Sequence, residues 1–456
     1  MKIKKASIRQ SIIIASLIFG MLFGAGNLIF PVHLGQLAGS NWLIASSGFL
    51  VSGVLLPLMA LLAISITRSN GIYDLALPNG RYYALIFLIL VHATLGPLFA
   101  TPRTATVPYE IGIAPYLSKS AANTWGLLIY SAIFFSLVYI FSNHEGKITT
   151  LIGKVLNPLF LLLLFLIFLL AFMHPLGSGN TAAITASYAR HAFSNGFLQG
   201  YNTMDGLAAL AFGITIITAI KELGIKKTRQ VSIETAKSGF LGIAGVAIIY
   251  LALIWLGATS LHQFKLAANG GITLAQISHH YLGTAGDAIL ATLATITCMT
   301  SAMGLVIAFS QDFHRRFPKI SYRTFLRINC GLSFLFANLG LDQIIAWSTP
   351  ILMFLYPLAI TLIILGLLSP IFKHDRLVYQ ITTTLTLIPA FFDMLNALPA
   401  NLHDSQLLQT LLGFAQQYFP FFSLGFGWLT FGIAGVILGL ICHVLKVRKR
   451  FGLLSE

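Results

Sequence analysis

Long apolar runs follow one another along almost the whole chain, and they constrain its fold more than any other feature. A helix needs about 20 apolar residues to cross the hydrocarbon core of a bilayer, and runs of about that length recur roughly twelve times. Hydrophobic residues make up 57% of the chain and charged residues only 9%, whereas a soluble domain carries about 25% charged residues. The sequence therefore predicts an all-α integral membrane protein with the lipid bilayer as its solvent. The predicted spans are 11–32, 42–66, 82–100, 124–141, 152–173, 196–220, 238–261, 288–310, 324–340, 344–368, 377–397 and 422–445. The third span is expected to continue as helix beyond Ala100.

The net charge of +15 reflects where the basic residues lie. They separate the apolar runs and form no stripe with interleaved aromatics, so nucleic acid is not an expected partner. Cytoplasmic loops of membrane proteins carry the excess of Lys and Arg. With the N-terminus inside, all basic residues except Arg103, Lys119, Arg190 and Lys265 fall on the cytoplasmic side. Residues 1–10 and 446–456 are therefore predicted to be cytoplasmic.

Residue types that carry out catalysis are scattered. The acids form no cluster, the histidines show no metal-binding spacing, and the three cysteines match neither a disulfide framework nor a zinc site. We therefore expect neither an enzyme nor a resident cofactor.

The first span is interrupted near its midpoint. Gly20, Gly24 and Gly26 lie there, and each interior glycine costs a helix about 1 kcal/mol relative to alanine. Asn27 adds a polar amide at membrane depth, and broken backbone is tolerated there only where it faces protein or a water-filled cavity. The alternative is a helix-packing face, since Gly20 and Gly24 form a G-x-x-x-G pattern. That alternative accounts for neither Asn27 nor the pair Gly24 and Gly26.

The sixth span carries a second interruption at residues 199–206. It includes Asp205, and an acid at membrane depth indicates a functional site by default. Alternatively, the stretch is an extracellular loop before a short span. However, residues 207–220 alone are too short to cross.

The two interruptions occupy matching positions in two halves of the chain that run in opposite directions. This is the expected trace of an inverted repeat of five spans in each half. Residues 11–173 would form the first repeat and residues 194–368 the second, with residues 377–445 as two additional helices.

Several segments also resemble a known family. Residues 23–31 resemble the first-helix signature of the bacterial branched-chain amino acid carriers, the BrnQ or LIVCS family within the amino acid-polyamine-organocation superfamily. Residues 96–107, 200–213 and 297–304 resemble the same family at corresponding places, while Asn202, Gly206 and residues 310–312 depart from its pattern. Residues 24–27 with 30–31 also resemble sodium-coupled symporters of the leucine-transporter fold. The resemblance implies uptake of Leu, Ile and Val across a bacterial inner membrane, through a leucine-transporter-like inverted repeat driven by an ion gradient.

An amino acid substrate brings two charges into a site of low dielectric, and each must be matched. Free N–H groups at the start of the outer half of the first helix would receive its carboxylate, favoured by the helix dipole. Carbonyls freed at the second interruption would accept its ammonium group. The predicted substrate-binding residues are Gly24, Ala25, Gly26, Asn27, Gly200, Tyr201, Asn202, Thr203 and Asp205.

A sodium site is implied by the resemblance to leucine-transporter-type symporters. Its ligands would be carbonyls at Gly20 and Phe23 and the hydroxyls of Thr300 and Ser301. The alternative for the two hydroxyls is a hydrogen bond back to their own helix.

Other roles stay open at this level. Asp205 could anchor the ammonium group, contact a cation, carry a coupling proton or cap the inner half of the sixth helix. Arg103 and Glu110 could form an outer gate pair or lie on a solvated helix end. The main functional alternative is a proton-coupled carrier of another small neutral amino acid or related metabolite, with Asp205 as the proton site. The sequence does not predict an oligomeric state.

Overall fold

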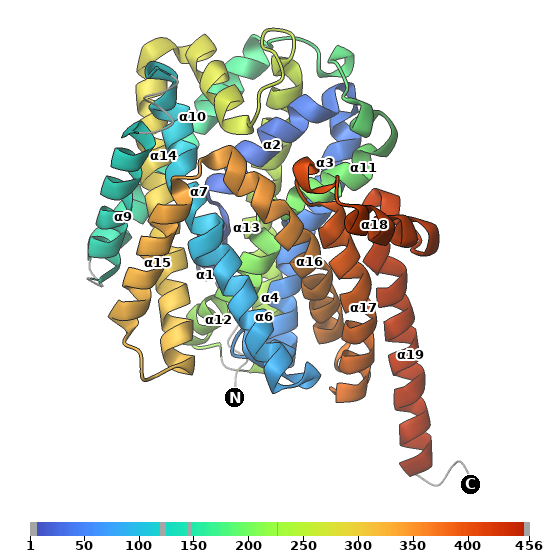
Figure 1. The fold of residues 1–456 in the computed structure, drawn as a ribbon. Helices are drawn as coiled ribbons and strands as arrows, with labels where there is room; N and C mark the ends of the chain where they lie inside the picture. The colour runs from blue at the N-terminus through green and yellow to red at the C-terminus, as the bar shows by residue number, and fades with distance from the viewer. Residues whose placement is uncertain (1–6, 119–124, 144–146, 226, 451–456) are drawn as a thin grey trace.

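The computed structural model describes residues 7–118, 125–143, 147–225 and 227–450, and every regular element in these ranges is helical. Most helices run between two opposite faces of the molecule, and α1 begins at the same face at which α19 ends (Figure 1). The main helices are α1 (Ile8–Leu22), α2 (Ala25–Ala38), α3 (Trp42–Leu50), α4 (Leu56–Thr67), α6 (Arg81–Ala93), α7 (Ala100–Gly112), α9 (Leu127–Asn143), α10 (Lys147–Met173), α11 (Ala186–Tyr201), α12 (Asp205–Glu222), α13 (Thr228–Ser260), α14 (Gly270–Arg316), α15 (Tyr322–Ala337), α16 (Leu341–Leu368), α17 (Arg376–Asn396), α18 (Gln406–Tyr418) and α19 (Gly427–Arg450).

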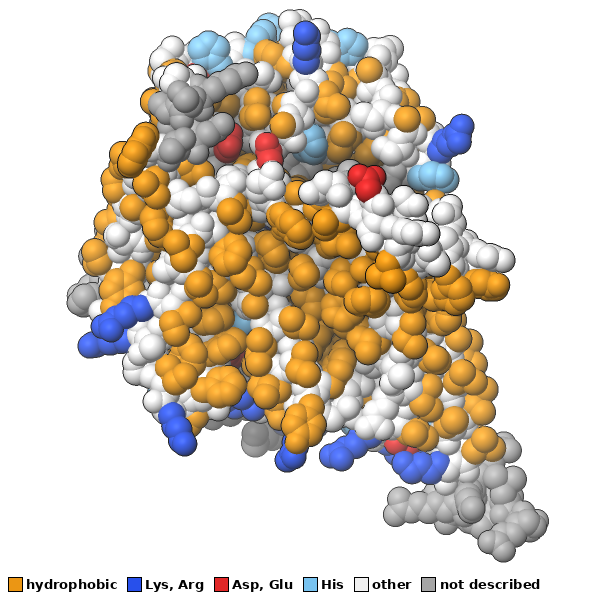
Figure 2. Space-filling view, in the orientation of Figure 1, with side chains coloured by type: hydrophobic (Ala, Val, Ile, Leu, Met, Phe, Trp, Pro, Cys, Tyr) orange, Lys and Arg blue, Asp and Glu red, His pale blue; other side chains and the backbone are white. Residues whose placement is uncertain are grey.

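The helices account for the apolar runs of the sequence. Figure 2 shows hydrophobic side chains over the middle of one side of the molecule, with Lys and Arg gathered mainly at the end where α1 begins. The number of membrane crossings stays a prediction. By length and composition, six stretches of the described chain could cross a membrane, namely 25–67, 81–112, 229–260, 270–316, 341–368 and 427–446. Three further apolar helices, 8–22, 127–143 and 161–173, are shorter.

The first predicted interruption is confirmed between α1 and α2. Phe23 and Gly24 there have extended backbone, with φ of −80° and −135°. The backbone N–H of Gly24 donates to the side-chain oxygen of Asn27 at 2.8 Å, so Asn27 satisfies a group that the break leaves open. The first span is therefore two half-helices joined by two extended residues.

The second interruption is confirmed between α11 and α12. Met204 precedes α12 in the left-handed region, with φ of 62°. The Thr203 hydroxyl donates to the carbonyl of Gly200 at 2.9 Å and closes the turn. α12 then begins at Asp205, which places this acid at the start of the second half-helix.

Helix packing sorts these elements into two groups. α1, α2, α3, α4, α11, α12 and α13 pack against one another and contain both interruptions. α7, α9, α14 and α15 form the second group, which meets the first where α2 contacts α7 and α14. α17 and α19 pack as a pair, with α17 against α16.

The third predicted span is irregular in the middle. α6 leads into a π-helical turn, η4 (Thr94–Leu98), in which Gly96 has a non-helical backbone with ψ of −116°. α7 then continues to Gly112, as expected from the sequence. This bend brings Arg103 of α7 to the centre of the molecule, where it is 2% exposed. The prediction that Arg103 lies on a solvated helix end is therefore wrong. Its predicted place on the outer side stays a prediction.

Candidate substrate and ion site

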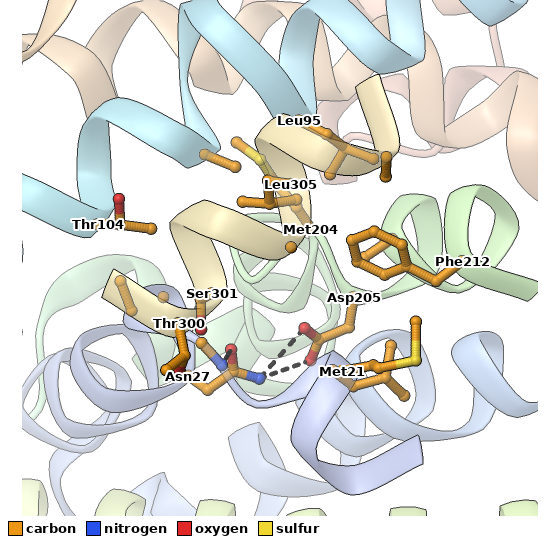
Figure 3. Close-up of a pocket in the computed structure, with 18 of the residues that line it drawn as sticks. Met21, Asn27, Leu95, Thr104, Met204, Asp205, Phe212, Thr300, Ser301 and Leu305 are labelled. Atoms are coloured by element: carbon orange, nitrogen blue, oxygen red, sulfur yellow. Dashed lines mark hydrogen bonds between the residues drawn. The ribbon is translucent and has the colours of Figure 1, made fainter. Parts of the chain in front are cut away.

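A cavity of about 390 Å³ lies where the two interruptions meet the second helix group (Figure 3). Its polar wall comes from the start of α2, the start of α12 and the middle of α14. Its remaining walls follow α1, α12 and α14 toward the face where α1 begins, and the side chains there are mostly apolar. The apolar lining includes Met21, Leu95, Ala208, Phe212 and Leu305.

Three buried side chains, Asn27, Asp205 and Tyr250, form a hydrogen-bonded cluster at the polar wall. The amide nitrogen of Asn27 donates to the two carboxylate oxygens of Asp205 at 3.1 and 2.9 Å. Tyr250 of α13 donates its hydroxyl to the same carboxylate and also contacts Asn27. Asn27 and Asp205 are each 2% exposed and Tyr250 is fully buried. A helix cap would require an N–H group of α12 to donate to this carboxylate. Among the described residues its donors are instead Asn27 and Tyr250, so the helix-cap alternative has no supporting hydrogen bond.

The start of α2 offers open hydrogen-bond donors to the cavity. Asn27 N–H donates to the carbonyl of Gly24 at 3.2 Å, whereas the N–H groups of Ala25 and Gly26 have no acceptor in the described part of the chain. A Cβ on Gly26 would lie 3.3 Å from the ring of Phe30 and 3.5 Å from the backbone of Thr203. Glycine therefore keeps the two interruptions close together here.

The predicted sodium ligands come from α14 and from the first interruption. Thr300 and Ser301 of α14 line the cavity with Gly20, whereas Phe23 does not and instead stacks on Phe19. A Cβ on Gly24 would lie 3.6 Å from the Ser301 oxygen, so Ser301 faces the first interruption.

The hydroxyls of Thr300 and Ser301 also form the hydrogen bonds of the alternative interpretation. They donate to the carbonyl of Thr297 at 2.7 and 3.2 Å. Each oxygen keeps acceptor capacity for a cation after donating its hydrogen.

The structure does not bring every predicted substrate residue to the cavity. Gly24, Ala25, Gly26, Asn27, Thr203 and Asp205 line it. Gly200 packs where α3 ends, since a Cβ there would lie 3.1 Å from the Phe49 carbonyl oxygen of α3 and 2.0 Å from the Ser52 oxygen just beyond it. Tyr201 stacks on Tyr356 at 4.0 Å between ring centroids. Asn202 lines a separate cavity of about 150 Å³ on the other side of the interruptions.

Arg103 lines the larger cavity and contacts two residues that line the smaller one. Its guanidinium donates to the carbonyl of Asn202 at 2.8 Å and to the hydroxyl of Ser348 on α16. Its charged group also lies 5.0 Å from the centre of the Phe30 ring. Glu110 is not its partner, because the described residues contain no ion pair between them. Arg103 therefore crosslinks α7 to both α16 and the second interruption.

Sequence reasoning missed two buried polar groups. Tyr250 gave no signal because it stands inside an apolar run. His92 of α6 is 2% exposed and its ring nitrogen lies 2.7 Å from the Asp312 carboxylate on α14. Ionisable residues that pair at membrane depth are typical of functional sites. This pair could have been predicted only with knowledge of which helices are adjacent.

Sequence comparison shows the family to which this arrangement belongs. A family model described as branched-chain amino acid transport protein matches residues 7–446. The chain belongs to this family.

Curated members of the family are similar over nearly their whole length. The branched-chain amino acid permease BrnQ of Lactobacillus delbrueckii subsp. lactis is 42% identical over 427 residues, 93% of this chain and 95% of the relative. BrnQ of Bacillus subtilis (strain 168) is 37% identical and covers 98% of this chain and 99% of its own. BrnQ of Escherichia coli (strain K12) is 35% identical, with 95% of each chain covered. As a family member this chain is a multi-pass membrane transport protein, and permeases are not enzymes.

Solved structures show the fold of this family member. Mhp1, a nucleobase-cation-symport-1 family transporter in a closed conformation with bromovinylhydantoin bound, matches with a TM-score of 0.60 and 12% identity over 98% of this chain and 94% of its own. MhsT in complex with L-phenylalanine matches with a TM-score of 0.53 and 15% identity over 97% and 99%. The expected leucine-transporter-like fold, with its interrupted first and sixth helices, is therefore confirmed.

Proposed function

We propose that this carrier is a symporter that imports Leu, Ile and Val together with sodium by alternating access. The observation that carries the proposal is the cavity at the two interruptions, which combines open N–H groups, a buried carboxylate and an apolar wall. Its volume of about 390 Å³ falls in the range of small-molecule sites, about 300–1,000 Å³. The family and its curated permeases support the choice of branched-chain substrates.

In this proposal the two charges of the substrate face different groups. The Ala25 and Gly26 N–H groups, at the positive end of α2, receive the carboxylate. Asp205 balances the ammonium group of the substrate. Hydrogen bonds from Asn27 and Tyr250 hold the Asp205 carboxylate in place. The aliphatic side chain extends along the apolar wall, where Met21, Phe212 and Leu305 are drawn in Figure 3.

Sodium binds beside the first interruption in this proposal. Thr300 and Ser301 line the cavity together with Gly20, and a Cβ on Gly24 would lie 3.6 Å from the Ser301 oxygen. Sodium is a hard cation that favours oxygen ligands of this kind. The two hydroxyls and the carbonyls at Gly20 and Phe23 are the proposed ligands.

The carrier is proposed to lie in the bacterial inner membrane with both termini in the cytoplasm. The gathering of Lys and Arg at the face where α1 begins supports this orientation (Figure 2). The cavity then extends toward the cytoplasm, and Arg103 lies on the outer side of the substrate.

Competition for uptake tests the substrate. Labelled isoleucine uptake is measured in a transport-deficient bacterium that expresses the chain, with unlabelled Leu, Val, Ala or Lys as competitors. Leu and Val should compete strongly, Ala weakly and Lys not at all. Competition by Lys alone would rule out the apolar substrate.

A proton-coupled carrier of another small neutral amino acid or related metabolite is the second candidate. It is favoured by Asp205, which is 2% exposed and has no basic partner among the described residues. Replacing sodium by choline separates the two. Loss of uptake supports sodium coupling, whereas uptake that survives in choline but is abolished by a protonophore supports the proton-coupled carrier.

A further inference from the structure

Arg103 is a buried cation without an acidic partner among the described residues. It is 2% exposed, and its acceptors are the backbone carbonyl of Asn202 and the hydroxyl of Ser348. Its Nε atom is buried and has no acceptor in the described chain. A buried charge is costly unless it is paired. An arginine in this state, on the wall of a ligand cavity, is suited to bind an anion.

A substrate carboxylate needs a positive group besides the end of α2, because Asp205 already lies next to that helix end. Asn27, in the first turn of α2, holds the Asp205 carboxylate next to the positive end of that helix. A substrate carboxylate at the Ala25 and Gly26 N–H groups would share this helix end with Asp205, and two carboxylates at close range repel each other. Among the described residues that line the cavity, Arg103 is the one base and Asp205 the one acid.

We propose that Arg103 binds the substrate carboxylate and so selects α-amino acids over amides and amines with the same side chain. The inference rests on the proposed function: Arg103 adds the positive charge that the substrate carboxylate needs beside the Ala25 and Gly26 N–H groups. The planar guanidinium fork matches a carboxylate with two parallel hydrogen bonds. Phe30 packs against the guanidinium and limits its movement. Arg103 and Asp205 then face the two opposite charges of one zwitterion.

The test is equilibrium binding of labelled leucine to the purified full-length protein in lipid nanodiscs. Unlabelled leucine, leucinamide and 3-methylbutylamine are the competitors, since the last two lack the carboxylate. The wild type should prefer leucine over leucinamide by about 30-fold or more, the range expected for hydrogen bonds between two charged groups. Arg103→Gln should weaken leucine binding by about 10- to 100-fold and leave leucinamide within about threefold, so that the preference is lost.

Two variants serve as comparisons. Arg190→Gln makes the same substitution at an exposed arginine of α11 and should leave both affinities within about twofold. Arg103→Lys keeps the charge but loses the planar fork, so it should reduce the preference for leucine at least about threefold. If Arg103→Gln does not give a monodisperse protein, the leucine and leucinamide affinities of Arg103→Lys test the inference instead.

Two outcomes would overturn the inference. An unchanged leucine affinity in Arg103→Gln would show that the guanidinium does not contact the substrate. Equal weakening of leucine and leucinamide would show that Arg103 only holds α7 to α16. A wild type that binds a different amino acid in place of leucine would instead refute the proposed substrate, and the comparison of acid with amide would then be repeated on that amino acid.

Discussion

The side-chain amide of Asn27 donates to both carboxylate oxygens of Asp205, at 3.1 and 2.9 Å, although the two residues are 178 positions apart. Each residue stands at the start of the second half of an interrupted helix. The hydrogen bonds therefore connect the two interruptions directly, and they fix the carboxylate at the cavity wall.

Removing the charge of Asp205 should weaken substrate binding. Asp205→Asn keeps the shape but leaves the substrate ammonium group without a countercharge, so leucine affinity should fall about tenfold or more. Tyr250→Phe removes one donor to Asp205 and keeps the contact of its ring with Phe49, so the loss should be only a few-fold, about 1 kcal/mol. Binding of labelled leucine measures both. Asp404→Asn, at an exposed acid, is the control, and wild-type affinity in Asp205→Asn would contradict the assignment.

A larger side chain at Gly26 should block the site without preventing membrane insertion. Gly26→Leu would place atoms against Phe30 and Thr203, where even a Cβ comes within 3.3 to 3.5 Å. We expect leucine binding to be lost while the protein remains in the membrane fraction and elutes as a single species. Gly331→Leu is the matched control, because a Cβ at that exposed helical glycine meets nothing within 4 Å. Full affinity in Gly26→Leu would mean that the glycine serves packing elsewhere.

The hydroxyls of α14 provide a test of sodium coupling. Thr300→Ala and Ser301→Ala should each raise the sodium concentration for half-maximal leucine uptake several-fold, because each removes one proposed oxygen ligand. Thr292→Ala is the control on the same helix, since Thr292 forms the same kind of hydrogen bond to its own helix, at 2.8 Å, but is exposed. Equal effects at all three positions would indicate a change in the helix alone and would count against the sodium site.

The acid at the start of α17 predicts a pH-dependent stability. Burial raises the pKa of Asp375, but hydrogen bonds with His443, the Leu377 N–H and Lys446 outweigh it and lower the pKa from 3.8 to about 2. A lowered pKa in the folded state contributes stability above pH 3.8, and this contribution is lost as the pH falls toward 2.

Asp375→Asn should therefore destabilise the protein at pH 7, by about 1 kcal/mol after solvent screening. Thermal unfolding of wild type and variant in detergent at pH 7, 5 and 3 measures the difference. The difference in Tm should be largest at pH 7 and should shrink at pH 3. A constant difference across this range would show that the charge of Asp375 is not what stabilises the contact between α17 and α19.

The interruptions could be predicted because local residue chemistry produces them. Gly24 and Gly26 weaken the helix, and Asn27 can satisfy the exposed backbone from within its own chain segment. Asp205 is costly at membrane depth wherever the neighbouring helices lie. These positions can therefore be predicted without knowledge of the tertiary structure.

The partners of these residues depend on packing and could not be read from the sequence. In the sequence Gly200 looks like the other glycines of the interruptions. The structure shows that it has a different role, because α11 packs so closely against α3 that no side chain would fit there. Tyr250 can donate to Asp205 only because α13 packs against α2 and α12. Arg103 was expected at an outer helix end, but the bend at Gly96 and the freed carbonyl of Asn202 create a buried position for it. Each of these contacts joins segments that are distant in the chain.

The direction in which the cavity extends has a consequence for inhibitor design. A compound shaped to fill it would reach Met21, Phe212 and Leu305 from the face where α1 begins. From the opposite face, Arg103 and its contacts with Asn202 and Ser348 stand in the way. In the proposed orientation this conformation is a template for compounds that first enter the cell. Drugs that act from outside would then need a conformation in which the Arg103 contacts are open.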